Sequence, residues 1–274
     1  MRRFAKRVSC GLLDSVSRTL FPDDCRVCGQ FLQQFSRIPV CSRCLAEPAP
    51  LVAEYFCVSC RMPFVNRFPL DETGRCALCR LGLHGFDAVY SYGSYEGALR
   101  KLVHLFKYEG VRPLAGHFGR YLAQALPRDA GFDVIVPMPL HWFKQWQRGF
   151  NQSELLAREI GRKWRVPVRN LVSRRRPTRP QAGLTNAKRR ENVRGAFQLT
   201  SFFGRSRRRH SLDGMRVLLV DDVVTTGATA SACARVLKRA GAAHVALLAL
   251  ARTDRRTTVE LSFTAGALTA GGAL

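Results

Sequence analysis

The chain has 274 residues and a formal net charge of +24, because 44 Lys and Arg residues stand against only 20 Asp and Glu residues. Its hydrophobic content of 46% suits a globular protein, and no apolar stretch of about 18 residues could cross a membrane. The length allows one α/β domain plus a small module. So strong a positive charge indicates an anionic partner, which could be nucleic acid, a membrane surface or a phosphorylated metabolite.

The first 20 residues predict an amphipathic helix, because apolar residues recur there at helical spacing between basic residues. Such a helix either packs on the rest of the protein or touches a membrane or nucleic acid. Asp14 and Arg18 interrupt its apolar run, so we do not expect a secretory signal peptide.

Eight of the ten cysteines form four Cys-x-x-Cys pairs, separated by 12, 12 and 15 residues. Two such pairs supply the four thiolates of a tetrahedral zinc site. Residues 21–82 therefore predict a module with two structural Zn²⁺ ions, which the metal would hold folded. Sequential pairing is the simplest arrangement, interleaved pairing stays open, and an iron–sulfur cluster competes. The expected ligands are Cys25, Cys28, Cys41, Cys44, Cys57, Cys60, Cys76 and Cys79.

Thiols in metal-ligand spacing are typical of a reducing compartment, so we expect a cytoplasmic protein. Strand-like and helical segments then alternate over residues 83–252, which predicts an α/β fold with a parallel sheet flanked by helices. We expect strands at 86–95, 132–136, 215–220 and 244–251, and helices at 97–108, 114–126 and 230–240, with another helix capped by Asn151 or Ser153. Residues 253–274 predict a disordered tail.

The strand at 132–136 runs into Pro137, Met138 and Pro139. Prolines end a strand and stiffen the turn that follows. Because ligands lie at the carboxyl ends of strands in α/β sheets, this turn is a candidate phosphate-contacting loop.

The segment from residue 141 to residue 210 carries 19 basic and three acidic residues, and its part over residues 171–194 predicts a mobile basic loop. Trp142, Phe143, Trp146 and Phe150 lie at its start. We expect Phe150 in the core and the two tryptophans exposed. Cations follow a phosphate backbone while aromatic faces stack unpaired bases, so the segment predicts binding of single-stranded DNA.

The strongest functional signal is VLLVDDVVTTGAT, residues 217–229, in which a buried strand ends at Asp221 and Asp222. A turn then leads into a helix, and N–H groups and hydroxyls at such a position can hold an anion. We predict that the two carboxylates accept hydrogen bonds from a diol or hold a metal ion while the turn binds a phosphate. The turn consists of Thr225, Thr226, Gly227, Ala228 and Thr229.

Residues 217–229 resemble the phosphoribosyl pyrophosphate (PRPP) motif of type I phosphoribosyltransferases. Over residues 20–252 the chain is similar to the ComF family of competence-associated proteins, which includes the relatives often called GntX. The similarity is carried by the cysteine pairs, FKYEG (106–110), VPMPL (136–140), RGFNQ (148–152), QAGL (181–184), RRENVRGAF (189–197) and the motif above.

The resemblance implies a type I phosphoribosyltransferase fold preceded by a double zinc ribbon. It implies that Asp221 and Asp222 bind ribose hydroxyls, that residues 225–229 bind the 5-phosphate, that residues 136–140 form the pyrophosphate loop, and that residues 176–194 cover the site. It also implies a role in natural transformation and in the use of imported single-stranded DNA, with DNA-uptake or recombination proteins as partners.

If pentosyl transfer occurs, Mg²⁺ bridges pyrophosphate and ribose oxygens while cations stabilise the leaving pyrophosphate. We expect Arg148, Arg189 and Arg190 to supply that charge. No segment for binding a nucleobase or amine acceptor is recognisable. Two hypotheses stay open: a PRPP-dependent transferase with an unidentified acceptor, and a DNA-processing accessory protein that keeps the fold as a binding module.

Overall fold

The computed structural model describes residues 24–32, 36–64, 66–67, 70–81, 85–175, 195–200 and 212–253. The helix expected over residues 1–20, the covering loop expected over residues 176–194 and the tail beyond residue 253 lie outside these ranges. Within the described part of the chain, no helix is long and apolar enough to cross a membrane.

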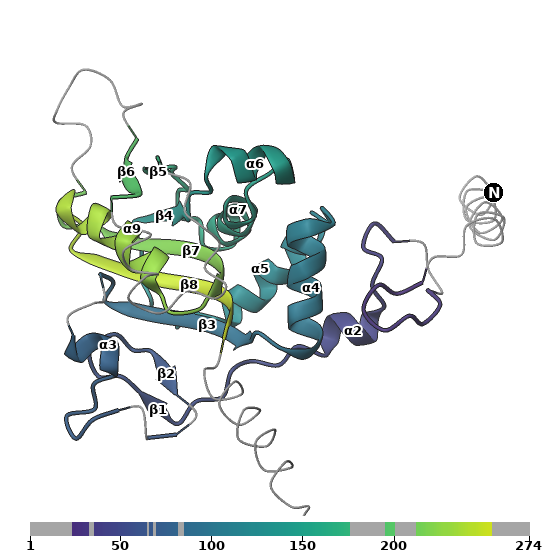
Figure 1. Ribbon diagram of the computed structural model, residues 1–274, viewed down its shortest axis with the longest axis horizontal. Coiled ribbons are helices and arrows are strands. Elements are labelled where there is room, and N and C mark those ends of the chain that lie inside the picture. The colour runs from purple at the N-terminus through teal and green to yellow at the C-terminus, as the bar shows by residue number, and fades with distance from the viewer. Residues whose placement is uncertain are drawn as a thin grey trace, which may run out of the picture.

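A four-stranded parallel sheet forms the centre of the molecule (Figure 1). Its order is β3-β8-β7-β4, and all adjacent strands pair in parallel. Helices cover both faces of the sheet, so its two central strands read as unbroken apolar runs. The strands are β3 (Ala88–Ser94), β4 (Val134–Pro137), β7 (Arg216–Val224) and β8 (His244–Arg252).

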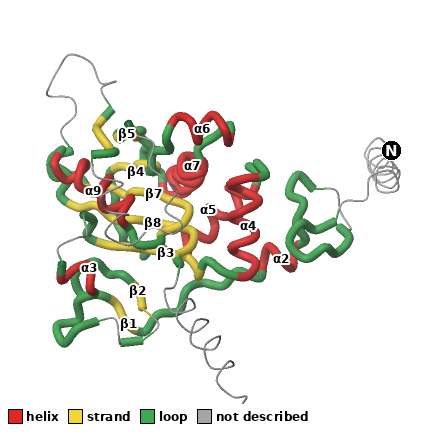
Figure 2. The backbone as a smooth tube through the Cα atoms, in the orientation of Figure 1, coloured by secondary structure: helices red, strands yellow, loops and turns green. Residues whose placement is uncertain are grey.

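Two apolar cores lie on the two faces of this sheet. Alternate residues of β7 point into different cores, with Leu218 and Val220 in one and Val217 and Leu219 in the other. The first core is covered by α4 (Gly97–Tyr108), α5 (Leu114–Ala125) and α7 (Gln152–Trp164), and the second by α9 (Ala228–Arg239) (Figure 2). A short helix, α6 (Trp142–Arg148), contributes no buried residue to either core.

The strand that carries the acidic pair is longer than the sequence predicts. The apolar pattern places its end at Val220, but β7 continues to Val224, because it stays paired with β8 as far as Arg252. Asp221 and Asp222 therefore lie inside the carboxyl-terminal part of the strand. The following helix begins at Ala228 and not at the expected Ala230, since Gly227 is its N-cap.

Two short strands lie on either side of residues 175–196, and the first of them stands where the sequence predicts the start of a mobile loop. β5 (Val172–Arg174) and β6 (Phe197–Leu199) pair antiparallel, with Arg174 opposite Phe197. The residues on either side of the undescribed range 176–194 thus lie together beside the main sheet.

The cysteine-rich region forms two modules in different places. The first contains α2 (Ser42–Ala46) and lies beside α4, whereas the second contains β1 (Tyr55–Phe56), β2 (Pro63–Phe64) and α3 (Ala77–Arg80) and lies beside β3 (Figure 1).

The chain between the two modules runs along the outer edge of β3. The hydroxyl of Tyr92 donates to the carbonyl of Pro48 at 2.7 Å, and the N–H of Leu51 donates to the carbonyl of Tyr92. Gly93 permits this approach, since a Cβ there would lie 2.9 Å from the carbonyl oxygen of Ala49. The connection therefore protects an edge strand that would otherwise expose unpaired backbone groups.

Candidate functional site

Asp221 and Asp222 are held by residues from two helices. Lys107 Nζ, at the end of α4, lies 2.8 Å from Asp222 Oδ1. Ser153 Oγ, at the start of α7, donates to Asp221 Oδ1 at 3.1 Å, and the backbone N–H of Asp222 donates to the same oxygen at 2.9 Å. Asp222 is only 8% exposed. The acidic pair is thus fixed in place at the carboxyl end of β7.

The charges at this site are coupled. Burial, and then the charge of Asp222, raise the pKa of Asp221 to about 7. Burial by itself would lower the pKa of Lys107, but the carboxylates of Asp222 and Asp221 outweigh it and raise that pKa above its usual value. The site therefore contains a Lys107–Asp222 ion pair beside a carboxyl group that titrates near neutral pH.

The RGFNQ segment joins the other motifs to this pair. Asn151 is the N-cap of α7, since its Oδ1 accepts from the N–H of Ser153 at 3.1 Å, and its Nδ2 donates to the carbonyl of Met138 at 3.1 Å. Gln152 Nε2 donates to the carbonyl of Lys107 at 3.4 Å. Because Asn151 caps the helix, the hydroxyl of Ser153 is left for Asp221. FKYEG, VPMPL, RGFNQ and the acidic motif therefore meet at one place.

The turn after β7 brings a helix N-terminus beside the carboxylates. Gly227 has φ +73° and is the N-cap of α9, which has 12 residues, and Thr226 Oγ1 accepts from the N–H of Ala228 at 3.3 Å. Thr225 is exposed, whereas Thr226 is buried and Thr229 lies in the first turn of the helix. Free N–H groups at such a terminus favour a bound anion. The predicted phosphate-binding residues are therefore brought together with the acidic pair.

The predicted second phosphate-contacting loop, residues 137–139, has no free backbone N–H group to donate to an anion. Pro137 and Pro139 have no N–H, and the N–H of Met138 donates to the carbonyl of Val220 at 2.8 Å. All three residues are buried. A phosphate contact made by backbone N–H groups of this loop would have to come from the residues that follow.

Of the cations expected at the site, the structure describes Arg148. Its guanidinium lies over the ring of Tyr108, 4.9 Å from the centroid, and its Nη1 donates to Gln152 Oε1 at 3.1 Å. Arg189 and Arg190 lie outside the described residues. Sequence reasoning missed Lys107 and Ser153 as partners of the acidic pair. The only signal for Lys107 was its place in FKYEG.

The aromatic residues that follow residues 137–139 include two exposed tryptophans and a buried Phe150, as the sequence predicts. Trp142 and Trp146 on α6 are 69% and 79% exposed, and Phe143 is 52% exposed. Phe150 is buried and packs edge-on against Phe106, with ring centroids 5.7 Å apart. Helix α6 thus presents an unburied aromatic surface next to the candidate site.

The cysteines form two separate groups of four, and the pairing is sequential. In each group all four sulfur atoms lie within 4.8 Å of one another. Cys28 Sγ and Cys41 Sγ are 3.8 Å apart, and Cys60 Sγ and Cys76 Sγ are 3.9 Å apart. Tetrahedral zinc with Zn–S bonds of about 2.3 Å requires sulfurs about 3.8 Å apart. Both clusters can therefore hold a zinc ion, and the interleaved alternative is excluded.

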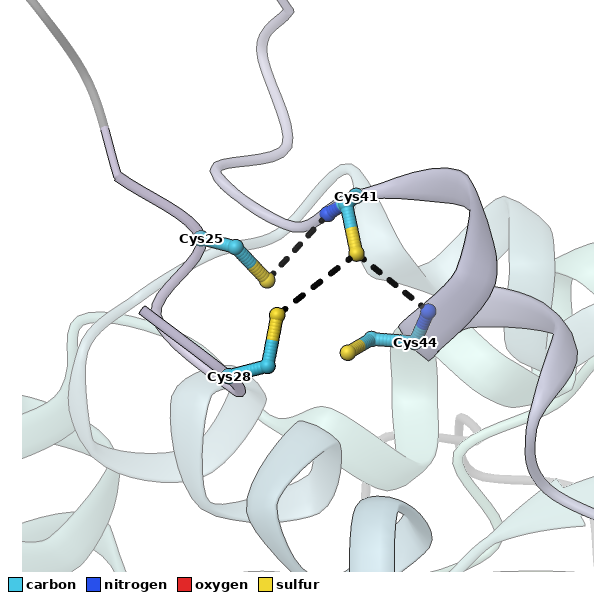
Figure 3. Close-up of side chains that lie close together, drawn as sticks. All are labelled: Cys25, Cys28, Cys41 and Cys44. Atoms are coloured by element: carbon cyan, nitrogen blue, oxygen red, sulfur yellow. Dashed lines mark hydrogen bonds between the residues drawn. The ribbon is translucent and has the colours of Figure 1, made fainter. Parts of the chain in front are cut away.

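Backbone N–H groups point at the sulfurs, as a thiolate cluster requires (Figure 3). Cys25 Sγ accepts from the N–H of Cys41 at 3.3 Å, and Cys41 Sγ accepts from the N–H of Cys44 at 3.4 Å. Burial would raise the pKa of Cys25, but the N–H groups of Cys41, Cys28 and Val27 lower it to about 6. Burial and the neighbouring sulfurs raise the pKa of Cys44. A bound cation would stabilise all four thiolates together.

Comparison with known proteins gives consistent results. The phosphoribosyl transferase domain family matches residues 152–265. Competence protein F of Haemophilus influenzae is 32% identical over 185 residues, which are 65% of this chain and 78% of that protein. The DNA utilization protein YhgH of Salmonella typhimurium is 32% identical over 224 residues, which are 78% of this chain and 89% of that protein.

Among solved structures, the glutamine phosphoribosylpyrophosphate amidotransferase of B. subtilis is 22% identical to this chain with a TM-score of 0.33. That alignment covers 50% of this chain and 26% of the amidotransferase. The domain match, the sheet with its flanking helices and the two cysteine clusters together give a phosphoribosyltransferase fold preceded by a cysteine-rich module that can hold two zinc ions.

Proposed function

The chain belongs to the ComF family of competence proteins, and we propose that it binds PRPP with Mg²⁺ at the site around Asp221 and Asp222. The observation that supports this most directly is the placement of a fixed carboxylate pair beside the N-terminus of α9. Carboxylate oxygens accept hydrogen bonds from a vicinal diol, and a helix N-terminus favours a phosphate. A ribose 5-phosphate group carries both chemical features.

Each part of the ligand would meet a different part of the site. The ribose hydroxyls would donate to Asp221 and Asp222, and the 5-phosphate would lie at the turn of residues 225–229. The carboxylate oxygens suit a hard cation such as Mg²⁺, which would neutralise charge on the pyrophosphate group when bound. Lys107 would balance the negative charge of Asp222 while the ligand enters.

Titration calorimetry with PRPP and Mg²⁺ tests this proposal. The wild-type protein should bind PRPP, and the double variant Asp221→Asn/Asp222→Asn should bind it at least about a hundredfold more weakly, because two charge-assisted acceptors worth about 1.5–3 kcal/mol each are lost. Asp129→Asn is the matched control, since this exposed carboxylate precedes the amino end of β4, whereas the acidic pair lies at the carboxyl end of β7. Unchanged PRPP affinity in the folded double variant would place the ligand elsewhere.

We propose in addition that the protein binds single-stranded DNA through α6. The supporting observation is the exposure of Trp142 and Trp146 on a helix that buries no residue, within a strongly basic segment. Aromatic faces stack bases of any sequence, and neighbouring cations attract the backbone. The name of YhgH, DNA utilization protein, agrees with such a partner. The setting would be natural transformation in the cytoplasm, where unpaired cysteines stay reduced.

Fluorescence anisotropy with a labelled oligonucleotide tests the DNA proposal. Trp142→Ala and Trp146→Ala should each weaken binding by about 1–3 kcal/mol, the usual value of one stacked base. Phe31→Ala is the control, because Phe31 is 53% exposed in the first cysteine module, away from α6. Binding should also weaken steeply with salt. If the wild-type protein does not bind DNA at low salt, the basic segment serves only the phosphate site.

The alternative function is catalysis of pentosyl transfer to an unidentified acceptor. Binding of PRPP is common to both functions, so only release of pyrophosphate separates them. A pyrophosphate-release assay with candidate nucleobases and amines, run with and without single-stranded DNA, decides between them. Turnover that depends on the acidic pair would establish an enzyme.

A further inference from the structure

One side of α4 carries a cation and two rings that face solvent. Arg100, His104 and Tyr108 are spaced by four residues, so they lie along the same side of the helix, away from the residues that α4 buries in the first core. All three side chains are exposed, and Tyr108 is 60% exposed. At a rise of 1.5 Å per residue, this row is about 12 Å long. We call these three residues the α4 stripe.

The rings of the α4 stripe form a succession of flat groups with Arg148. The centroids of the His104 and Tyr108 rings are 4.8 Å apart with their planes tilted by 46°, and the guanidinium of Arg148 lies 4.9 Å from the centroid of Tyr108. Because the two rings are tilted and not stacked face to face, part of each ring still faces solvent. A single exposed tyrosine needs no explanation, but several flat groups in succession offer more than one surface on which a base can stack.

The α4 stripe meets α6 at Arg148. At 100° per residue, Trp142 and Trp146 lie on one side of α6 and Arg148 lies on the other, which is the side that contacts Tyr108. Arg148 Nη1 donates to Gln152 Oε1 at 3.1 Å, and this hydrogen bond helps to hold the guanidinium over the ring of Tyr108. The exposed aromatic residues of α6 and the α4 stripe are therefore neighbouring surfaces, joined where the two helices end.

The charge along the α4 stripe suits a polyanion. Arg100 adds an exposed cation at the end of the stripe that lies farther from α6. Glu109 Oε1 lies 3.8 Å from His104 Nδ1, but Arg26 Nη1 lies 2.7 Å from the other oxygen of that carboxylate and balances its charge. Cations beside flat, exposed rings match a single-stranded nucleic acid, since its phosphates need the first and its unpaired bases need the second.

We propose that the α4 stripe is a second contact surface for single-stranded DNA, where bases stack on Tyr108 and His104 while Arg100 attracts the backbone. The inference rests on the proposed function in one respect, that the strand on α6 is the one that continues over α4. It goes beyond that function because α4 lies outside the basic segment of residues 141–210. It also brings the strand close to the acidic pair, since Tyr108 directly follows Lys107, which pairs with Asp222.

Fluorescence anisotropy with a labelled oligothymidylate of about 12 nucleotides tests the α4 stripe. Tyr108→Ala should weaken binding by about fivefold or more, whereas Tyr108→Phe should retain it, because the ring remains. Arg100→Ala should flatten the dependence of affinity on salt, because one phosphate contact is lost. Phe56→Ala and Arg239→Ala are the matched controls, since both residues are exposed, the first in the second cysteine module and the second on α9 across the sheet.

Photocrosslinking separates a direct contact from a merely structural role of Tyr108. An oligonucleotide that contains 5-iodouracil forms a covalent link under ultraviolet light to aromatic side chains that touch the base. Wild-type protein should give a crosslinked peptide that contains Tyr108 or His104. A tyrosine that only supports Arg148 would give no such peptide, and its absence would overturn the inference even if Tyr108→Ala failed to fold.

The outcomes separate this inference from the proposed function. If Trp142→Ala and Trp146→Ala weaken DNA binding while Tyr108→Ala does not, the inference is overturned and the proposal for α6 stands. Weaker binding in folded Tyr108→Ala, with no effect of the two tryptophan variants, would support the α4 stripe and overturn the proposal for α6. Wild-type protein that does not bind DNA at low salt would overturn both. Thermal denaturation of each variant shows whether it is folded.

Discussion

The two four-cysteine clusters share one local structure. In each, the third cysteine, Cys41 or Cys76, is the N-cap of a short helix, and its N–H donates to the sulfur of the first cysteine at 3.3 Å. In each, the residue after the second cysteine, Gly29 or Arg61, has a positive φ and donates its N–H to the carbonyl of the first cysteine. The chain therefore contains the same cysteine knuckle twice, each time in a cluster that can hold a metal ion.

Their surroundings differ. In the first cluster Cys28 is exposed and Cys41 partly buried, while Cys25 and Cys44 are buried in the core that also contains α4 and α5. Polar contacts add to this packing, with Arg26 to Glu109 at 2.7 Å and Lys101 Nζ to the carbonyl of Val27 at 2.9 Å. In the second cluster Cys57, Cys60 and Cys76 are buried and belong to the core beneath α9.

The second cluster is also connected to the turn of residues 225–229. Phe86 belongs to the same core, and a Cβ on Gly227 would lie 3.3 Å from its ring. Arg252, at the end of β8, donates to the carbonyl of Pro63 and lies 5.6 Å from the ring centroid of Phe64. The cysteine spacing thus determines that each four-cysteine cluster forms, and the burial of a cluster determines which other parts of the molecule depend on it.

Removal of a buried thiolate should have the largest effect. Wild-type protein should contain two zinc ions per chain, and Cys60→Ser should contain one. Because structural zinc supplies much of the folding energy of so small a module, Cys60→Ser should lower the melting temperature and abolish measurable PRPP binding. Elemental analysis, thermal denaturation and calorimetry measure these effects. Normal PRPP affinity in Cys60→Ser protein that has lost one zinc would show that the buried second cluster does not support the PRPP site.

Removal of a ligand contact should have an intermediate effect. Asp222→Ala should weaken PRPP binding by about 1.5–3 kcal/mol, the usual value of a hydrogen bond to a charged group, while both zinc ions stay bound. Calorimetry and elemental analysis on the same preparation measure both. A larger loss of affinity in Cys60→Ser than in Asp222→Ala shows that the second cluster supports the whole site and not one contact.

Removal of a thiolate from the first cluster should affect PRPP binding least. Cys41→Ser should lose one zinc and unfold the first module, yet its PRPP affinity should stay within about twofold, because the module's described contacts are with α4 and α5 and not with the acidic pair or the turn of residues 225–229. Calorimetry on the folded variant tests this. A loss as large as that of Cys60→Ser would mean that the contact of Arg26 with Glu109 transmits the damage through α4.

Local patterns in the sequence predict most of the fold. Apolar runs mark the strands, and cysteine spacing marks the two metal sites, because both depend on neighbours in sequence. Similarity to a known motif locates the acidic pair. The end of β7 could not be predicted in this way, because two successive carboxylates normally mark the end of a buried strand. Here the strand continues through them, since β7 stays paired with β8 and since Lys107 and Ser153 contact the two carboxylates.

The partners of the acidic pair could not be predicted, because they meet it only in the folded chain. Lys107 lies in the last turn of α4. The helical periodicity of this segment predicts which apolar residues are buried, but it does not predict the partner of a lysine. Helix α6 gave no helical signal either, since periodicity reveals a helix through its buried face and α6 has no fully buried residue. The sequence therefore did not predict that Lys144 is partly buried.

The opposed faces of α6 have a thermodynamic consequence. One helix of about two turns carries the partly buried Lys144 and Arg148 on one side and the exposed Trp142 and Trp146 on the other. An anion that fixed the inner face would also fix the outer one, and so would lower the entropy cost of stacking a base there. Linkage then requires reciprocity: whatever factor such an anion adds to the affinity for DNA, DNA must add to the affinity for the anion.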